Sequence, residues 1–437
     1  MPSVERPAPA SDNIEGLRER LRAAIVAAVI VGIAARVTFG FLYWTGKPLT
    51  LDEQEYLLLA RSLASGRGYS YGASMSTVRH FERPPIYPLF IAGIFRLTGN
   101  VAAPPGGDTG VPASVKITQS LLGIAIIWLI ACIARRAAGP GAAVLAAWLA
   151  ALYPPLVWIC AYALNEVLYA VLALLAVWLL DKAIHQADRE CRWAVFSAGV
   201  AAGLAVLTKE AMVFFLVLAG TWLLIRRRSM LAALLLAGAL VVLLPWVGRN
   251  YLVHGRFVLG AAHGGITFWT GNNPLASGEG DMAANPDLRR AAVAFEEQHQ
   301  GLSAQELDSL YYREALGYIV RHPAWYVALE AKKLFHTFVP IGRSYRLHSN
   351  LYFIASVVSY LALLPFALAG LAILARRADQ PRALWLMAGS AVVVSLVFFP
   401  QERFRIPIID PTLIVCAGAA LAGPVETWVT SLRGGRA

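Results

Sequence analysis

The chain has 437 residues, of which 58% are hydrophobic and 15% charged, and its mean hydropathy is +0.57. Soluble domains average about 45–50% apolar and about 25% charged residues, so this composition excludes an ordinary soluble globule and a disordered chain. The formal net charge of +11 does not indicate nucleic-acid binding, because the basic residues lie in short clusters between apolar runs. The composition predicts an all-α polytopic membrane protein.

Residues 1–22 are expected to form a cytoplasmic tail, and residues 23–43 are the first of ten apolar runs. This first run ends in Tyr43-Trp44 and not in a small-residue cleavage site, so we expect a retained helix and no cleavable signal peptide. The other predicted spans, two of them short, are residues 113–134, 141–160, 163–181, 193–207, 211–225, 230–248, 350–375, 383–399 and 406–423.

The placement of Lys and Arg predicts the orientation of these spans. With ten spans, the basic clusters all fall on one side, which the positive-inside bias makes cytoplasmic, together with both termini. The opposite side receives the loops 44–112 and 249–349. The four cysteines show no metal-ligand or redox spacing, so no disulfide framework or zinc finger is expected.

Asp52-Glu53 follows the first span within a few residues. A pair of acids at the outer face could provide a general base toward a hydroxyl or an amine. The alternative is structural, because acids near a helix start stabilise the helix dipole, and Thr50 or Asp52 could cap a helix that runs to Leu63. The motif continues through Tyr56 on the same predicted helix.

The second motif is Glu82-Arg83-Pro84. The apolar stretch from Pro84 to Thr98 is too short to span a membrane and contains three prolines, so it predicts an interfacial or re-entrant helix. An arginine beside a proline-fixed turn suits a phosphate, since guanidinium is planar, permanently charged and bidentate. Snorkelling of Arg83 to lipid headgroups is the alternative.

These two motifs, in this order, resemble the glycosyltransferase-C superfamily and, more narrowly, glycosyltransferase family 39. That family holds protein O-mannosyltransferases and bacterial transferases of 4-amino-4-deoxyarabinose to lipid A. The resemblance is strongest over about residues 20–250, recurs near 399–411 and is weak across 270–349. It implies a glycosyltransferase-C fold with about ten transmembrane helices, an extracytoplasmic juxtamembrane helical loop and a small extracytoplasmic α-rich segment. It also implies a polyprenyl-phosphate sugar donor.

Further polar groups are expected at the same outer face. They are Asn165-Glu166, Thr208-Lys209-Glu210, Trp246 with Arg249-Asn250, and the segment Gln401-Glu402-Arg403-Phe404-Arg405-Ile406-Pro407. Lys209 resembles the lysine of the family's Thr-Lys turn, and residues 401–407 resemble its His/Gln-x-Arg-(Tyr/Phe)-Arg-x-Pro element. Each group alone could be a helix-end residue at headgroup level, whereas their common side favours a site.

We therefore expect inverting sugar transfer with Asp52 as general base and with Glu53 supporting it or binding substrate. The residues expected to bind the donor phosphate are Arg83, Lys209, Arg403, Arg405 and Arg36. The residues expected to bind substrate are Tyr56, Glu82, Asn165, Glu166, Glu210 and Glu402.

Two of these expectations have open alternatives. Arg36 lies inside the first span, where an arginine is costly, and it could reach a lipid phosphate or simply snorkel. Some relatives hold a metal on positions that match Glu82 and His263, so a divalent ion (Zn, Mg or Mn) is possible. Two ligands do not establish a site, however, and His263 is more simply a surface histidine.

We expect an N-terminal transmembrane catalytic module (23–248, including loop 44–112), an extracytoplasmic loop domain (249–349), and C-terminal transmembrane helices with a short tail (350–437). The expected location is the bacterial inner membrane with the site facing the periplasm. The expected partners are the polyprenyl-phosphate sugar donor, membrane lipid, and an acceptor lipid, glycan or protein, without nucleic acid.

The rival classes are a transporter or flippase of a lipid-linked or small anionic substrate, and an O-antigen polymerase or ligase. A transporter would place charges near the midplane or on broken helices, whereas here, apart from Arg36, the spans are nearly free of charge. Polymerases and ligases lack the Asp-Glu pair followed by Glu-Arg-Pro. A catalytically inactive relative that binds lipid-linked sugar is a third alternative, which the retention of Asp52 disfavours.

Overall fold

The computed structural model describes residues 10–71, 83–104, 107–185, 189–255, 259, 264–280, 282, 285–340, 350–377 and 379–434. Every regular element in these ranges is a helix, and none of the described residues forms a β-strand. The predicted all-α architecture is confirmed.

Each predicted apolar run coincides with helical structure. The helices are α1 (Ala10–Thr38) with the π-helical turn η1 (Phe39–Tyr43), α4 (Ala113–Ala138), α5 (Pro140–Leu152) with α6 (Pro154–Trp158) and η3 (Ile159–Ala161), α7 (Glu166–His185), α8 (Arg189–Val206), α9 (Met212–Ile225), α10 (Ser229–His254), α15 (Asn350–Ala375), α16 (Arg382–Val397) and α18 (Ile409–Gly434). Among the described residues, five helices are long and apolar enough to cross a membrane, or six if the pair broken by 64° after α5 is one span. The remaining apolar helices are shorter, so a polytopic protein is confirmed but the count of ten spans is not.

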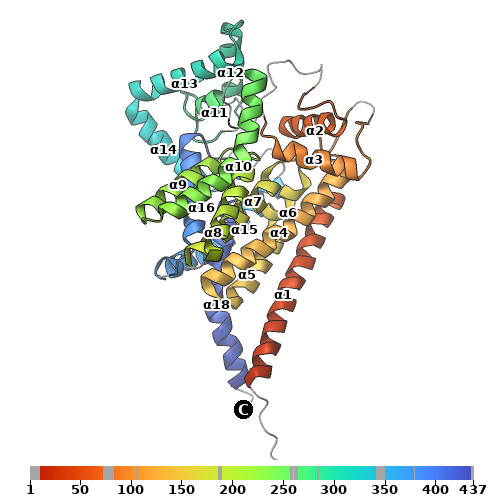
Figure 1. Ribbon diagram of the computed structural model, residues 1–437, viewed down its shortest axis with the longest axis vertical. Coiled ribbons are helices and arrows are strands. Elements are labelled where there is room, and N and C mark those ends of the chain that lie inside the picture. Colours follow the sequence, from red (N-terminus) through yellow and green to blue (C-terminus); the bar gives the residue numbers. More distant parts are fainter. Residues whose placement is uncertain are drawn as a thin grey trace, which may run out of the picture.

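The remaining helices belong to the connections predicted to lie outside. They are α2 (Leu51–Ala64), α3 (Ile86–Leu97), α11 (Gly264–Gly271), α12 (Pro286–Gln298), α13 (Ala304–Arg321), α14 (Pro323–Phe338) and α17 (Glu402–Arg405). α2, α3, α12 and α13 lie at one end of the molecule and the C-terminus lies at the other (Figure 1). The long connections 44–112 and 249–349 therefore extend from the same end of the bundle.

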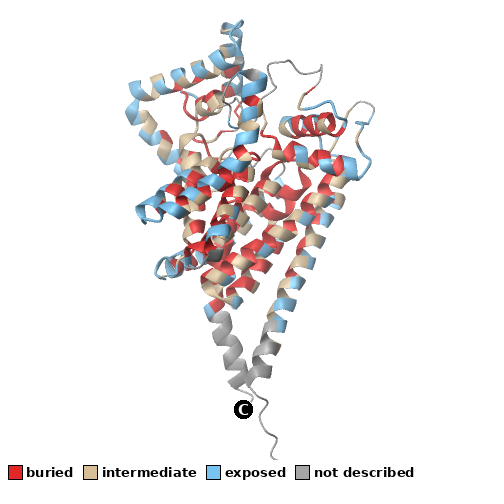
Figure 2. Cartoon of the chain, in the orientation of Figure 1, coloured by how far each residue is buried: buried red, intermediate tan, exposed pale blue. Residues whose placement is uncertain are grey.

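From Asp287 to His336 the sequence predicts a helical stretch broken near Pro323; the structure has that break and a second one after Gln298. The second break ends at Ser303, whose side chain and Glu306 form a capping box that starts α13. Figure 2 shows that α13 and α14 are largely exposed, whereas buried residues concentrate in the centre of the bundle and in α2.

Small residues let the spanning helices approach closely, as is common in membranes. A Cβ atom on Gly199 of α8 would lie only 2.1 Å from the carbonyl oxygen of Leu235 in α10. A Cβ atom on Gly123 of α4 would lie 2.5 Å from Nε of Arg36. The absence of a side chain at Gly123 therefore provides the room in which Arg36 of α1 is buried.

Arg36 is only 1% exposed, and its guanidinium binds carbonyl groups at the broken end of α5. Nη2 donates to the oxygen of Ala150 (3.2 Å) and Nη1 to that of Ala151 (3.3 Å). In a continuous helix these oxygens would accept from the N–H groups four residues on, but those residues are Pro154 and Pro155, which have no N–H. Arg36 thus supplies the donors that the two prolines cannot, a role that the sequence did not predict.

Replacing Arg36 by methionine is expected to lower the free energy of unfolding by about 2–6 kcal/mol, since each of the two buried carbonyls left without a donor costs roughly 1–3 kcal/mol. In a Pro154→Ala/Pro155→Ala background the same replacement should cost clearly less, because backbone N–H groups then reach the two carbonyls. Unfolding of the detergent-solubilised protein by SDS titration measures both costs. Arg135→Met, at an exposed position near the end of α4, is the control. Equal costs of Arg36→Met in the two backgrounds would contradict this role.

Candidate active site

The centre of the candidate site is the carboxylate of Asp52, in the first turn of α2. Arg83 donates from Nη2 to Oδ1 of Asp52 (2.5 Å), and Arg403 donates from Nη1 to Oδ2. The side chains of Asp52 and Arg83 are each 22% exposed and that of Arg403 is 32% exposed, so solvent can reach all three. The structure therefore joins the Asp-Glu motif, the Arg-Pro motif and the segment between the last two spans in one cluster.

The position of Arg83 is fixed by three neighbours besides Asp52. Its Nε donates to Oε2 of Glu55 (2.7 Å), and its guanidinium carbon lies 5.1 Å from the ring centre of Tyr56. The hydroxyl of Tyr69 donates to the backbone carbonyl of Arg83. These contacts hold one guanidinium edge toward Asp52, so the alternative considered above, snorkelling of Arg83 to lipid headgroups, is not the arrangement found.

Burial alone would raise the pKa of Asp52, but the guanidinium groups of Arg403 and Arg83 outweigh it and hold this pKa well below its usual range. Asp52 is accordingly an anion throughout the physiological pH range. In this arrangement it is a counterion of two arginines and a weak proton acceptor.

Lys209 lies beside the cluster, in the connection between α8 and α9. Its Nζ donates to Oε1 of Glu166 (2.9 Å) and lies 4.0 Å from the ring centre of Phe404, which follows Arg403 in the chain. Burial lowers the pKa of Lys209, and the carboxylate of Glu166 opposes this shift. The structure thus brings the predicted residues Lys209 and Glu166 next to the Asp52 cluster as a pair.

Glu53 points away from this cluster. Its Oε2 accepts from the N–H (2.8 Å) and the hydroxyl (2.9 Å) of Thr50, which forms the capping box that starts α2. Its Oε1 accepts from the N–H of Ala163 (2.9 Å). With both oxygens engaged, Glu53 ties α2 to the connection before α7, and this geometry favours a supporting role over proton transfer.

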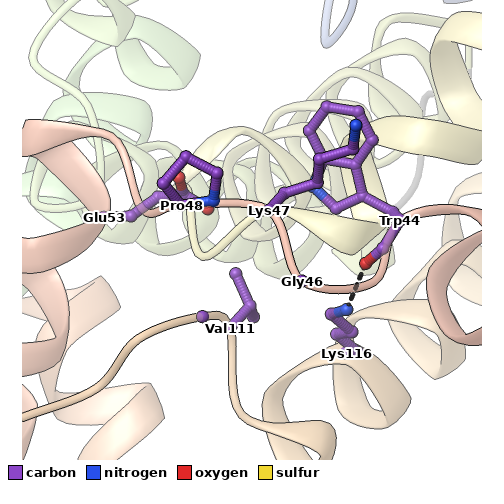
Figure 3. A pocket seen from close by; sticks show the side chains of 8 residues that line it. Trp44, Gly46, Lys47, Pro48, Glu53, Val111 and Lys116 are labelled. Atoms are coloured by element: carbon purple, nitrogen blue, oxygen red, sulfur yellow. Dashed lines mark hydrogen bonds between the residues drawn. The ribbon is translucent and has the colours of Figure 1, made fainter.

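A small cavity of about 70 Å³ lies behind Glu53, between the end of α1, the start of α2 and the start of α4. Figure 3 shows Lys116 and Trp44 at its rim, with the Lys116 ammonium directed to the Trp44 carbonyl (2.7 Å). Lys116 also donates to the carbonyl of Gly40 (2.9 Å). Lys116 therefore links α4 to the end of the first span. Asp52 does not line this cavity.

Two other predicted substrate residues lie near the Lys209 pair. The side-chain amide of Asn165 donates to the carbonyl of Thr208 (2.7 Å) and so joins the start of α7 to the connection between α8 and α9. Glu210 follows Lys209 and is partly buried. Asn165 thus positions the segment that carries Lys209.

Arg405 and Glu402 belong to a second, deeper cluster. Nε of Arg405 lies 2.8 Å from Oδ1 of Asp410, and its guanidinium carbon lies 4.3 Å from the ring centre of Tyr360. Oε1 of Glu402 accepts from the hydroxyl of Ser356 (3.1 Å). Arg405 thus neutralises a buried acid next to the segment that carries Arg403 and does not join the Asp52 cluster.

Burial raises the pKa of Glu402 to about 7, although Arg405 opposes the shift. This folded-state pKa lies above the unfolded value of 4.5, so the folded protein favours the protonated form of Glu402. The contribution of Glu402 to the free energy of unfolding is therefore complete below about pH 4.5 and is lost as the pH rises through 7. The loss is at most about 3 kcal/mol. We expect the melting temperature of the wild type to fall between pH 5 and 8 more than that of Glu402→Gln, and parallel curves would contradict this.

The metal-ligating residues suggested by the resemblance, Glu82 and His263, lie outside the described residues. Within the described ranges, no group of three or more His, Cys, Asp or Glu side chains could hold a metal ion. Both oxygens of Asp52 face guanidinium groups, an environment that does not suit a cation.

The architecture is that of the glycosyltransferase-C fold. The chain is similar to an archaeal oligosaccharyltransferase, AglB from Archaeoglobus fulgidus, solved with an inhibitory peptide and a dolichol-phosphate (TM-score 0.55, 14% identity, 94% of this chain and 52% of that chain). It is also similar to the oligosaccharyltransferase of the same organism tethered to an acceptor peptide (TM-score 0.56, 14% identity, 92% and 50%). Our chain thus spans about half the length of these proteins, and the likeness shows the fold alone.

The family resemblance is supported independently by the sequence. Residues 82–248 match the family model described as dolichyl-phosphate-mannose-protein mannosyltransferase. A search of curated proteins gave no significant match. ArnT from Cupriavidus metallidurans, solved with undecaprenyl phosphate, aligns with a TM-score of 0.42 (14% identity, 93% of this chain and 78% of that chain), which is too low for an argument. The expected resemblance to polyprenyl-phosphate-dependent glycosyltransferases is confirmed by the fold and the family model.

Sequence reasoning missed several residues that build the site. Glu55 holds Arg83, and it lies three positions after Asp52 on the same face of α2, a spacing that could have revealed it. Tyr69 follows the predicted helix and Phe404 lies inside the segment 401–407, but nothing in their spacing pointed to Arg83 or Lys209.

Proposed function

We propose that this protein is an integral-membrane glycosyltransferase that moves a sugar from a polyprenyl-phosphate carrier to an acceptor hydroxyl. The observation that carries the proposal is the contact of one carboxylate with two arginines from distant segments, at the end of the bundle that bears the long connections. Transfer from a lipid phosphate needs a proton acceptor and fixed positive charge where the leaving group forms. Asp52, Arg83 and Arg403 supply these groups, and Lys209 adds a cation beside them.

In the proposed step, the acceptor oxygen attacks the anomeric carbon from the face opposite the phosphate, so the configuration inverts. The O–H proton passes to Asp52 as the new C–O bond forms. The bond between the anomeric carbon and the phosphate oxygen breaks, and its electron pair leaves with the polyprenyl phosphate. The singly charged phosphodiester thus becomes a doubly charged monoester, and the two guanidinium groups stabilise the added charge.

The proposed setting is the bacterial inner membrane, with the site facing the periplasm. The basic clusters of the sequence support this orientation, because with ten spans they all fall on the side opposite the loops 44–112 and 249–349. We propose residues 23–248 as the catalytic transmembrane module. The connection 249–349 is then an extracytoplasmic domain beside the acceptor, which is a lipid, a glycan or a protein.

A transporter is less well supported by the structure. The main sequence feature in its favour was Arg36 inside a span, and the contacts of Arg36 with the carbonyls of Ala150 and Ala151 assign it a structural task. The charged groups of the candidate site instead lie on α2, on the short helix α17, at the first residue of α7 and in connections between helices.

Mass spectrometry of lipids that co-purify with the protein from its native membrane tests the proposal. We expect a polyprenyl phosphate or its sugar adduct, and the mass of the adduct identifies the sugar class. The same preparation should then transfer that sugar from the isolated adduct to membrane acceptors. Recovery of bulk phospholipid alone, together with no transfer, would contradict the proposal.

A further inference from the structure

Without a ligand, the two arginines of the site are already occupied by Asp52. Each of its oxygens accepts from one guanidinium group, Oδ1 from Arg83 and Oδ2 from Arg403. An anionic phosphate that uses these same arginines must therefore compete with Asp52 for them. Asp52, the proposed proton acceptor, therefore occupies the position that the negatively charged phosphate of the donor would take.

We infer that the lipid phosphate binds by displacing the Asp52 carboxylate from Arg83 and Arg403, so that Asp52 becomes a competent base only when a lipid phosphate is present. This inference rests on the proposed function and adds an order of events to it. In the free site, Asp52 is paired with the two arginines and is a weak base. In the occupied site, Asp52 is released from them and can accept a proton.

Each arginine has a second partner that keeps it in place when Asp52 leaves. Glu55 accepts from Nε (2.7 Å) and lies 2.6 Å from Nη2 of Arg83. The side-chain oxygen of Gln401 accepts from Nε of Arg403 (2.9 Å). The exchange therefore moves one aspartate side chain and leaves both guanidinium groups positioned.

The charges balance through such an exchange. With the donor bound, the site holds two guanidinium groups, the released Asp52 carboxylate and a singly charged phosphodiester. After transfer, Asp52 carries the proton and is neutral, while the phosphate monoester carries two negative charges. The two positive charges of the site are thus balanced by two negative charges before and after the step, which avoids an uncompensated charge in a partly buried site.

The other ionisable groups around Asp52 have partners of their own and do not take its place between the two arginines. Glu53 is bonded to Thr50 and Ala163, and Glu166 is paired with Lys209. Tyr56 contacts Arg83 through its ring, and burial raises the pKa of its hydroxyl well above the usual range, so it stays neutral. Among the described neighbours, Asp52 is the acid that both arginines share.

Titration calorimetry of the detergent-solubilised full chain with farnesyl phosphate, a short polyprenyl phosphate, tests the exchange. Asp52→Asn should bind this probe about tenfold more tightly than the wild type, because it removes the competing negative charge, while it loses transfer. Asp52→Ala, which removes the carboxylate differently, should also bind more tightly. Asp287→Asn changes the net charge equally at an exposed position on α12 and should bind like the wild type.

The outcomes separate the inference from the function on which it rests. Equal or weaker binding by both Asp52 variants, with binding still lost in Arg403→Ala, would overturn the exchange and leave the phosphate site standing. Absence of farnesyl phosphate binding in the wild type and in both Asp52 variants would contradict the proposed function itself.

Discussion

Replacing Asp52 by asparagine is expected to lower kcat for sugar transfer by about 10²–10⁴-fold, the usual contribution of a positioned general base. Asparagine has nearly the same shape, and its amide oxygen can still accept from a guanidinium group, so the cluster should stay folded. It cannot take a proton from the acceptor. Transfer from a radiolabelled polyprenyl-phosphate sugar to membrane acceptors measures the change.

Glu55→Gln is the matched control for this variant, because it removes a carboxylate from the same cluster and from the same helix. It should reduce the rate less, since Glu55 acts only by positioning Arg83, and the reduction should fall mainly on KM for the donor. Asp52→Asn protein that transfers sugar at the wild-type rate would rule out Asp52 as the base.

Replacing Arg403 by alanine is expected to lower kcat by about 10²–10³-fold, the loss typical of removing one group that stabilises developing negative charge. One of the two cations that face the leaving phosphate is then missing. The pKa of Asp52 should also rise toward its usual value, since Arg403 is the larger of the two charge effects that lower it. The dependence of kcat on pH should therefore differ from that of the wild type.

Arg403→Lys separates charge from geometry, because it keeps the charge but loses the forked guanidinium. We expect it to recover part of kcat and little of the affinity for donor phosphate. Arg289→Ala, at an exposed position on α12, controls for the loss of one positive charge. If Arg403→Ala raised KM for the donor but left kcat unchanged, Arg403 would bind the ground state only, and its proposed role in the transition state would be wrong.

Local features of the sequence predicted much of the fold. The apolar runs coincide with helices, and the cap at Thr50 follows from the pattern of a hydroxyl residue followed three positions later by Glu53. The short helix α3 after Pro84 was predictable as a helix too short to span a membrane, although its place at the membrane stays a prediction. In each case the information lies within a few residues of the chain.

What the sequence could not predict depends on distances between segments. The sequence showed that Arg36 is costly inside a span, but it did not show that Arg36 donates to two carbonyl groups at the end of α5. It assigned Arg405 to the donor phosphate, whereas the fold buries Arg405 against Asp410. It placed Lys209 and Glu166 on the same side of the membrane but could not show that they form a pair. Such partners are chosen by helix packing, which no local pattern records.

The ion pair between Asp52 and Arg403 joins residues that are 351 positions apart. At about 5–20 residues per second, a ribosome needs roughly 20–70 s to proceed from one to the other. During that interval the nascent chain already contains Asp52 and Arg83 but not yet Arg403. On the proposed function, a chain without its last helices therefore lacks one of the two cations that face the leaving phosphate, and full transfer activity is expected only once those helices have been inserted.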